Sequence, residues 1–339
     1  MNLKKILRAQ EWWSFILPPV FLFYYVGLLQ FPRAGRSIYF EMITLMIVSV
    51  ITAIIGYFIN DLFDIHDDLK AGKKNYVSSF PLWLKALFFP LCISLLLILW
   101  LINQRLILVE RASLYAVTCA ANTMLFVVYS MPPIRFKKAI YIAPILDALY
   151  SGTLFYILAF ILATQNTGNN TPMLCILIWA FCKGLRNYLS HLCDDKENDE
   201  SSGMPTLATV YGKESLQKTA NLLFPVEILC LLVLQTVLIN TSYPFIILCL
   251  VFIVLWFQKM QENSSIKYPF LNELHEIYLP VAILVQVVFT FHSLYPMLIL
   301  HFVFFPFHLS KMYFTIKNSI FKLFNKEPLS WKELLNGKK

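Results

Sequence analysis

The sequence predicts an all-α, multi-pass membrane protein, a bundle of about nine transmembrane helices around a central cavity. Three observations support this prediction, and two of them concern composition: 58% of the 339 residues are hydrophobic and only 14% are charged. A soluble domain carries roughly 25% charged residues. The third observation is that the apolar residues form long runs, each near the ~20 residues that a helix needs to cross the hydrocarbon core. The lipid bilayer is therefore the expected surrounding.

Nine apolar runs account for most of the chain. The first lacks a cleavage site for a signal peptide, so we expect it to remain as a helix. The cysteines lie mostly inside the runs without a CxxC pair, which predicts free thiols rather than disulfides or a zinc site. The runs cover about residues 12–31, 40–60, 82–103, 107–129, 139–164, 172–193, 219–240, 243–258 and 277–308.

The last run is long for one crossing. Its 32 residues would extend about 48 Å as a helix, against a hydrocarbon core of ~30 Å. A bent helix or a tight hairpin between His292 and Pro296 would fit, and the hairpin would return the tail to the side of the N-terminus. We predict a transmembrane domain over 1–308 and a basic tail over 309–339. The tail is either a solvated extension or an interfacial helix, with apolar positions Phe314, Ile316, Ile320, Phe321, Leu323 and Phe324.

The net charge of +8 is a topology signal, because the basic residues lie in short connections between apolar runs. We therefore expect no nucleic-acid partner. Connections after the second, fourth, sixth and eighth runs are long or charged, whereas those at 165–171 and 241–242 carry no charge. This asymmetry predicts that the even-numbered connections and the N-terminus face the cytoplasm, in a plasma (inner) membrane.

Two acidic clusters stand out in this apolar chain. The stretches from Asp61 to Asp68 and from Asp194 to Glu200 hold nine of the 20 acidic residues, and their motifs read Asn60-Asp61-x-x-Asp64-x-x-x-Asp68 and Asp195-x-x-x-Asp199. On a helix, the three aspartates of the first cluster lie within about 60° of one another and the two of the second within about 40°. Because one cluster follows the second run and the other the sixth, both belong to one membrane face and can converge on one site. Asp67, Asp194 and Glu200 point off these faces and are expected to be solvated.

Carboxylates this close repel one another unless a cation lies between them. Mg²⁺ is the ion of choice, since it takes a few carboxylates together with substrate phosphate oxygens. The spacing of an EF-hand is absent, and so are the His and Cys ligands that zinc prefers. The sequence thus predicts two Mg²⁺ ions held by catalytic carboxylates against a diphosphate. The alternative is that the clusters only solvate the connections. The predicted ligands are Asp61, Asp64, Asp68, Asp195 and Asp199.

These motifs resemble those of the UbiA-type intramembrane prenyltransferases, whose signature is N-D-x-x-D-x-x-x-D after the second helix and D-x-x-x-D after the sixth. The second motif continues as Asp195-Lys-Glu-Asn-Asp199-Glu-Ser-Ser-Gly203-Met-Pro-Thr206-Leu-Ala-Thr-Val-Tyr-Gly212, similar to the family pattern. A third stretch, Tyr129-Ser130-Met-Pro132-Pro133-Ile-Arg135-Phe-Lys137, is similar to the family's Y-S-x-P-P-x-R-x-K. One departure is Gly72-Lys73-Lys74-Asn75, where many members carry an arginine-proline pair.

The resemblance implies Mg²⁺-dependent transfer of a prenyl group from an isoprenyl diphosphate to a lipophilic or aromatic acceptor, whose identity stays open. Cyclisation of the prenyl chain and phosphoribosyl transfer to a polyprenyl phosphate are alternatives within the family. A cation transporter is an alternative of another class, but its carboxylates would lie near helix midpoints. The implied diphosphate-binding residues are Asn60, Lys74, Arg135 and Lys137, and the residues of the reaction chamber or its surroundings are Tyr57, Tyr129, Asp147 and His191.

Overall fold

A computed structural model describes most of the chain, and every regular element in the described part is helical. The predicted all-α class is therefore confirmed. Two compact units divide the chain, Met1–Thr241 and Ser242–Lys339. The predicted division at residue 308 lies inside the second unit and stays a prediction. The described residues are 9–31, 37–70, 72, 74–103, 109–164, 171–203, 205–238 and 272–323.

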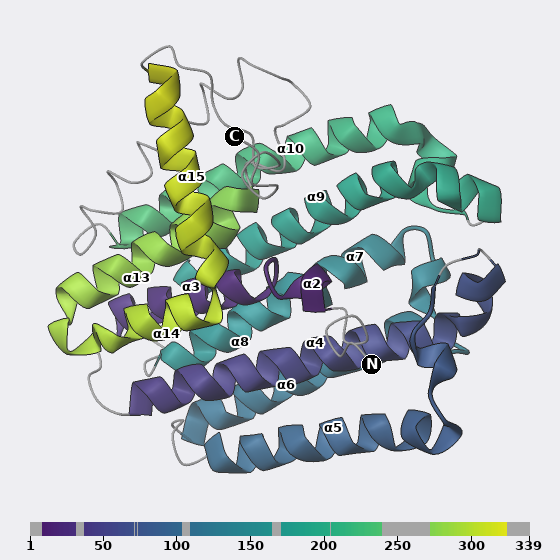
Figure 1. Ribbon diagram of the computed structural model, residues 1–339, viewed down its shortest axis with the longest axis horizontal. Coiled ribbons are helices and arrows are strands. Elements are labelled where there is room, and N and C mark those ends of the chain that lie inside the picture. The colour runs from purple at the N-terminus through teal and green to yellow at the C-terminus, as the bar shows by residue number, and fades with distance from the viewer. Residues whose placement is uncertain are drawn as a thin grey trace, which may run out of the picture. The chain divides into compact units, whose positions relative to one another are not determined.

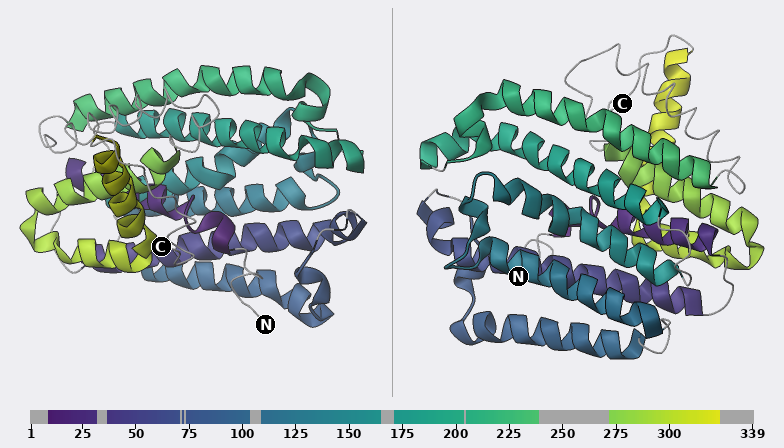
Figure 2. Two further views of the ribbon diagram at one scale, coloured as in Figure 1. Left: turned by 45° about the horizontal axis from the view of Figure 1, so that its top comes forward. Right: turned by 180° about the vertical axis from the view of Figure 1, so that it is seen from behind.

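The first unit is a bundle of long helices that run side by side (Figures 1 and 2). The predicted apolar runs form its helices, because a helix satisfies its own backbone hydrogen bonds in lipid. Its elements are α2 (Ala9–Trp12), α3 (Leu17–Gln30), α4 (Ser37–Lys70), η1 (Val77–Ser79), α5 (Leu82–Asn103), α6 (Val109–Ser130), η2 (Phe136–Lys138), α7 (Ile142–Ala148), η3 (Leu149–Thr153), α8 (Leu154–Ala163), α9 (Thr171–Ser202) and α10 (Leu207–Leu238).

Five described helical segments are long and apolar enough to cross a membrane: α4, α5, α6, the continuous α7–α8 segment and α10. Two others, α3 and Leu274–Thr290, are apolar but shorter. α9 is not among the five, and its apolar part contains Lys183 and Arg186. The predicted run at 243–258 lies outside the described residues, so nine is an approximate count. The six cysteines in the described part are free thiols, as predicted.

Small residues let the helices of the first unit approach closely. A Cβ on Gly56 of α4 would lie 2.2 Å from the Phe126 ring of α6, and one on Gly184 of α9 would lie 2.9 Å from Ala148 of α7. Such contacts suit a bilayer, where packing at short range rather than exclusion of water drives helix association. Gly56 is one turn before Asn60, so this contact holds the end of α4 against α6.

A fully buried ion pair joins α9 and α10, two long neighbouring helices of the bundle. The Arg186 guanidinium donates from Nε to Glu227 Oε1 at 2.6 Å and from Nη2 to Oε2 at 3.2 Å, and both side chains are 0% exposed. Two parallel hydrogen bonds of this kind give geometric specificity as well as energy. The pair therefore sets the register of α10 on α9.

The second unit contains η6 (Leu274–Tyr278), α13 (Leu279–Thr290), η7 (His292–Leu294), α14 (Pro296–Phe304) and α15 (Pro306–Leu323). The predicted run at 277–308 is interrupted twice, at Phe291 and at Phe305, which both leave helical geometry. After these breaks, Pro296 begins α14 and Pro306 begins α15. At the first position of a helix the N–H that proline lacks would have no helical partner. α14 folds back along α13 (Figure 1), as in the hairpin alternative, and α15 departs at a bend of 84°.

Candidate functional site

The two acidic clusters lie on helices rather than in connections. α4 continues to Lys70 and α9 to Ser202, so all five predicted ligands keep the one-sided arrangement that a helix imposes. These two helix ends and the connection between α6 and α7 lie at the same end of the first unit, on the right in Figure 1 and on the left in the right panel of Figure 2. The fold therefore gathers three sequence motifs at one end of the bundle.

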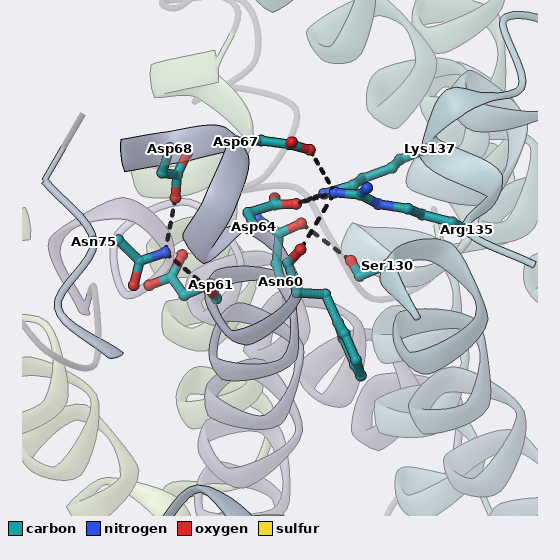
Figure 3. A network of polar contacts seen from close by, with 10 residues as sticks. Asn60, Asp61, Asp64, Asp67, Asp68, Asn75, Ser130, Arg135 and Lys137 are labelled. Atoms are coloured by element: carbon teal, nitrogen blue, oxygen red, sulfur yellow. Dashed lines mark hydrogen bonds and ion pairs between the residues drawn. The ribbon is translucent and has the colours of Figure 1, made fainter. Parts of the chain in front are cut away.

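Arg135 and Lys137 converge on the first cluster. Arg135 Nη2 donates to Asp64 Oδ1 at 2.7 Å, to Asp67 Oδ2 at 2.8 Å and to the backbone oxygen of Phe63 at 3.3 Å (Figure 3). Lys137 Nζ forms an ion pair with the same oxygen of Asp64. Asp67, expected to be solvated, is thus part of the site, because the α6–α7 connection reaches the helix from that side.

The backbone of Arg135 is unusual. It adopts left-handed geometry, φ 42° and ψ 58°, just before η2. A residue with a Cβ in this region costs on the order of 1–3 kcal/mol and persists only where its surroundings hold it. Here the three hydrogen bonds donated by the side chain do so, aided by the Arg135 N–H, which donates to Met131 O at 2.9 Å. The turn therefore directs the Arg135 guanidinium toward α4.

The two cations respond differently to their surroundings. Burial alone would lower the pKa of Arg135, but hydrogen bonds and charge attraction from Asp64 and Asp67 outweigh it and raise that pKa above its usual value. For Lys137, burial dominates and lowers the pKa below that of a free lysine, although Asp64 opposes the shift. Arg135 is thus a permanent positive charge, whereas Lys137 gives up its proton more readily than an ordinary lysine.

Asn75 is a residue of the site that sequence reasoning missed. Its Nδ2 donates to Asp68 Oδ2 at 2.9 Å and to Asp61 O at 2.8 Å (Figure 3). Its Oδ1 accepts a hydrogen bond from Ser78 N at 3.1 Å. The signal in the sequence is the departure from the family pattern at Gly72-Lys73-Lys74-Asn75, which Asn75 ends. Lys74 instead lies exposed with Nζ 5.2 Å from the Tyr76 ring centre, and no contact seen in the described residues joins it to the carboxylates.

Asn60 ties the first cluster to the third motif. Its Oδ1 accepts a hydrogen bond from Ser130 Oγ at 3.0 Å, across 70 residues of sequence. Ser130 is the last residue of α6 and is buried. This contact holds the end of α4 to the start of the turn that carries Arg135.

The second cluster has its own charge partners. His191 Nε2 lies 3.2 Å from Asp195 Oδ2, one helical turn away, so the predicted neighbour of the cluster does contact it. Asp199 is half-buried and interacts electrostatically with Tyr188, whose hydroxyl also interacts with that of Tyr129. The flanking Glu197 and Glu200 pair with Lys213 at 3.6 Å and Lys196 at 3.3 Å.

A group of tyrosines surrounds Asp147 in the interior of the first unit. Tyr150 donates to Asp147 Oδ1 at 2.5 Å, and its ring meets that of Tyr129 edge to face at 5.0 Å. The Tyr129 hydroxyl interacts with those of Tyr150 and Tyr188. Tyr150 lies in η3, a π-helical turn of the kind that often marks functional positions. Tyr129 and Asp147 were predicted, whereas Tyr150 and Tyr188 were not. Tyr57 is half-buried on α4, one turn before Asp61.

The oxygens of the first cluster are the donor type that Mg²⁺ prefers. In the described ranges, no three or more His, Cys, Asp or Glu side chains come together as a ready-made metal site. Asp64 is held by Arg135 and Lys137, and Asp68 by Asn75. Positive and amide groups thus hold the carboxylates, which would otherwise repel one another.

Comparisons with known proteins bear on this site. A sequence model of the UbiA prenyltransferase family matches residues 16–269. No relative was found among curated protein sequences. Two solved structures share the fold. A structure of digeranylgeranylglyceryl phosphate synthase is 16% identical, with a TM-score of 0.58 over 84% of this chain and 96% of that one. A UbiA homologue from Archaeoglobus fulgidus, bound to Cd²⁺, is 20% identical, with a TM-score of 0.52 over 84% of this chain and 99% of that one.

Proposed function

Because this chain belongs to the UbiA prenyltransferase family, we propose that it transfers a prenyl group from an isoprenyl diphosphate to a lipophilic or aromatic acceptor in a Mg²⁺-dependent reaction. Membership in the family makes the chain an integral membrane prenyltransferase. The donor, the metal and the class of acceptor are what we propose. The observation that carries it is the convergence of Arg135 and Lys137 on Asp64 at the end of α4. Fixed cations beside carboxylates can bind both a diphosphate and its metal.

The carboxylates of both clusters are the proposed metal ligands. Asp61, Asp64 and Asp68 approach from α4, while Asp195 and Asp199 approach from α9 at the same end of the bundle. Two Mg²⁺ ions bound there would neutralise the charge that develops on the departing diphosphate. Asn75 orients Asp68, and His191 orients Asp195, through the contacts they already make.

Arg135 and Lys137 are the proposed diphosphate clamp. Their contacts with Asp64 keep both positive charges at the site, so they need little rearrangement to meet phosphate oxygens there. The planar guanidinium can bind two oxygens at once, and the ammonium acts as a point charge. Asn60 holds the turn through Ser130. Lys74 is proposed to contact the diphosphate from the outside, since its flexible side chain is exposed.

Ionisation of the allylic C–O bond leaves a positive charge on the prenyl group, and this charge must be kept from water. The ring faces of Tyr129 and Tyr57 are proposed to stabilise it. On the acceptor side, the Asp147 carboxylate accepts a hydrogen bond from Tyr150 within the interior. We assign to this pair the removal of the proton that an acceptor loses when the new bond to the prenyl carbon forms. Released diphosphate leaves from the charged end of the bundle.

That end is proposed to face the cytoplasm, with the protein in the plasma (inner) membrane. The support is the distribution of basic residues in the connections, which favours the cytoplasmic side for 60–81, 130–138, 194–218 and 259–276.

The experiment that tests the proposal uses the purified chain in lipid vesicles. Labelled prenyl diphosphates of several lengths are supplied with and without Mg²⁺, together with membrane lipid extract as the acceptor source, and the lipid product is identified by mass. We expect a prenylated lipid only with Mg²⁺, and loss of diphosphate release in Asp64→Asn and Asp195→Asn. Glu200→Gln is the matched control, because this exposed carboxylate pairs only with Lys196 in the described contacts. Unchanged release in both aspartate variants would refute the mechanism. If a cyclic hydrocarbon formed without an acceptor, the proposed function would be cyclisation rather than prenyl transfer.

A further inference from the structure

α15, outside the part of the chain that matches the family, has the pattern of a helix that lies on a membrane. At about 100° per residue, six apolar positions of α15 fall within a stripe about 100° wide. The positions are Leu309, Met312, Tyr313, Ile316, Ile320 and Leu323. Phe314 and Phe321, two of the apolar positions that the sequence offered for an interfacial helix, lie outside this stripe.

The charges of α15 are all positive. Lys311, Lys317 and Lys322 occupy positions outside the apolar stripe, and the range 306–323 contains no acidic residue. Lys317 Nζ lies 5.7 Å from the ring centre of Tyr313, beside the edge of the stripe. A tyrosine next to a lysine at the margin of an apolar face is typical of the boundary between lipid chains and headgroups.

Of the three stripe residues whose side chains are described, two are exposed and Met312 is half-buried. Leu309 is 54% exposed and Tyr313 is 58% exposed, although both are large and apolar. His308, on another face, is fully buried, and its Nδ1 lies 3.0 Å from Nε2 of His301 on α14. The start of α15 is therefore attached to α14, while its stripe stays open.

The bend between α14 and α15 decides between crossing and lying flat. α15 has 18 residues, about 27 Å at 1.5 Å per residue, so its length alone would nearly span the core. A crossing, however, would place Lys317 in the hydrocarbon region, where a charged side chain is costly. After a turn of 84° from the apolar α14, α15 can lie along the surface instead, with its lysines reaching the headgroups.

We propose that α15 is an interfacial helix that binds anionic phospholipid headgroups, with its stripe inserted among the acyl chains and its lysines against the negative charges. Anionic lipid is the chosen partner because three lysines without a single acid make the helix complementary to a negatively charged surface. The proposed lipid site uses none of the residues of the carboxylate clusters, and it does not depend on the proposed prenyl transfer.

The test compares amide hydrogen exchange over 306–323 in the full chain, one molecule per nanodisc, in phosphatidylcholine and in phosphatidylcholine with phosphatidylglycerol. We expect exchange at least about fivefold slower with the anionic lipid. Lys311→Gln/Lys317→Gln/Lys322→Gln should abolish that difference, whereas Leu309→Ser/Tyr313→Ser should speed exchange in both lipids. Lys4→Gln/Lys5→Gln/Arg8→Gln removes the same charge elsewhere and should leave the difference intact.

Equal exchange in the two lipids would overturn the proposal, as would a lipid difference that survives in the triple lysine variant. Slow exchange in both lipids that persists in Leu309→Ser/Tyr313→Ser would assign α15 to a protein contact instead. Each variant is compared at equal helix content and elution volume, so a folding defect is recognised before exchange is measured.

Discussion

Arg135 and Asp64 are 71 residues apart in the chain and are joined by a hydrogen bond of 2.7 Å. The contact connects the turn after α6 to the last turns of α4, and Lys137 strengthens it by pairing with the same carboxylate oxygen. A cation–carboxylate pair held in this way is assembled before any substrate arrives. Preorganisation of this kind is what makes charged groups effective in a partly buried site.

Replacing Arg135 by lysine should impair diphosphate binding although the charge is kept. Lysine lacks the planar guanidinium, whose Nη2 contacts both Asp64 and Asp67 while its other N–H groups can meet phosphate oxygens, so we expect kcat/KM for the prenyl diphosphate to fall about 10–100-fold. Steady-state prenyl transfer in vesicles measures this. Lys218→Arg, an exposed exchange on α10, should leave the rate unchanged. A wild-type rate for Arg135→Lys would mean that only net charge matters.

Asn75→Ala should weaken Mg²⁺ activation. The variant removes the amide that holds Asp68 Oδ2, and such outer contacts typically change metal affinity about 10–100-fold. The measurement is the Mg²⁺ concentration that gives half the maximal rate. Ser79→Ala, an exposed neighbour that hydrogen-bonds only to the Tyr76 backbone in the described contacts, is the control. The role of Asn75 is refuted if both variants require the same Mg²⁺ concentration as the wild type.

The pH profile should report on Lys137. Because burial lowers the pKa of Lys137, the amine loses its charge as the pH rises through a value below that of a free lysine. We therefore expect kcat/KM to decline on the alkaline side at that lower pH. Lys137→Arg, which stays protonated, should move the decline to higher pH. An alkaline limb that stays in place in this variant would assign it to another group.

Asp147→Asn should slow the acceptor step and leave donor binding intact. Loss of a general base typically costs about 100-fold or more, so kcat should fall while KM for the prenyl diphosphate is unchanged. Tyr150→Phe, which removes the 2.5 Å hydrogen bond to Asp147, should have a smaller effect in the same direction. Equal loss of donor binding in both variants would indicate a packing role. Single-turnover product formation separates the two outcomes.

The Arg186–Glu227 pair should matter for stability. Glu227→Gln removes the negative charge that accepts two hydrogen bonds from the buried Arg186 guanidinium, and breaking a buried ion pair costs about 3–5 kcal/mol of the free energy of unfolding. The double variant Arg186→Met/Glu227→Leu should lose less stability than the single variant, since it removes both buried charges of the pair. Unfolding in sodium dodecyl sulfate titrations gives both values. A double variant less stable than Glu227→Gln would contradict this account.

The helices and the acidic clusters could be predicted because their signals are local. An uninterrupted apolar run forms a helix in lipid whatever surrounds it, and carboxylates at intervals of three and four residues share one face of any helix. The length of the last apolar run likewise predicted a break near Pro296, although it did not distinguish a bend from a hairpin. The resemblance in three motifs then indicated the family, which the match over residues 16–269 confirms.

The sequence by itself determined the membrane class, the helical segments, the family and the residue types at one end of the bundle. Only the tertiary structure decided that Asp67 joins Arg135, that Asn75 rather than Lys74 holds the first cluster, and that Arg186 meets Glu227. These contacts join residues that different elements carry, and their partners depend on the direction from which a turn or a neighbouring helix arrives. That direction is set by packing of the whole bundle, which no local pattern of residues records.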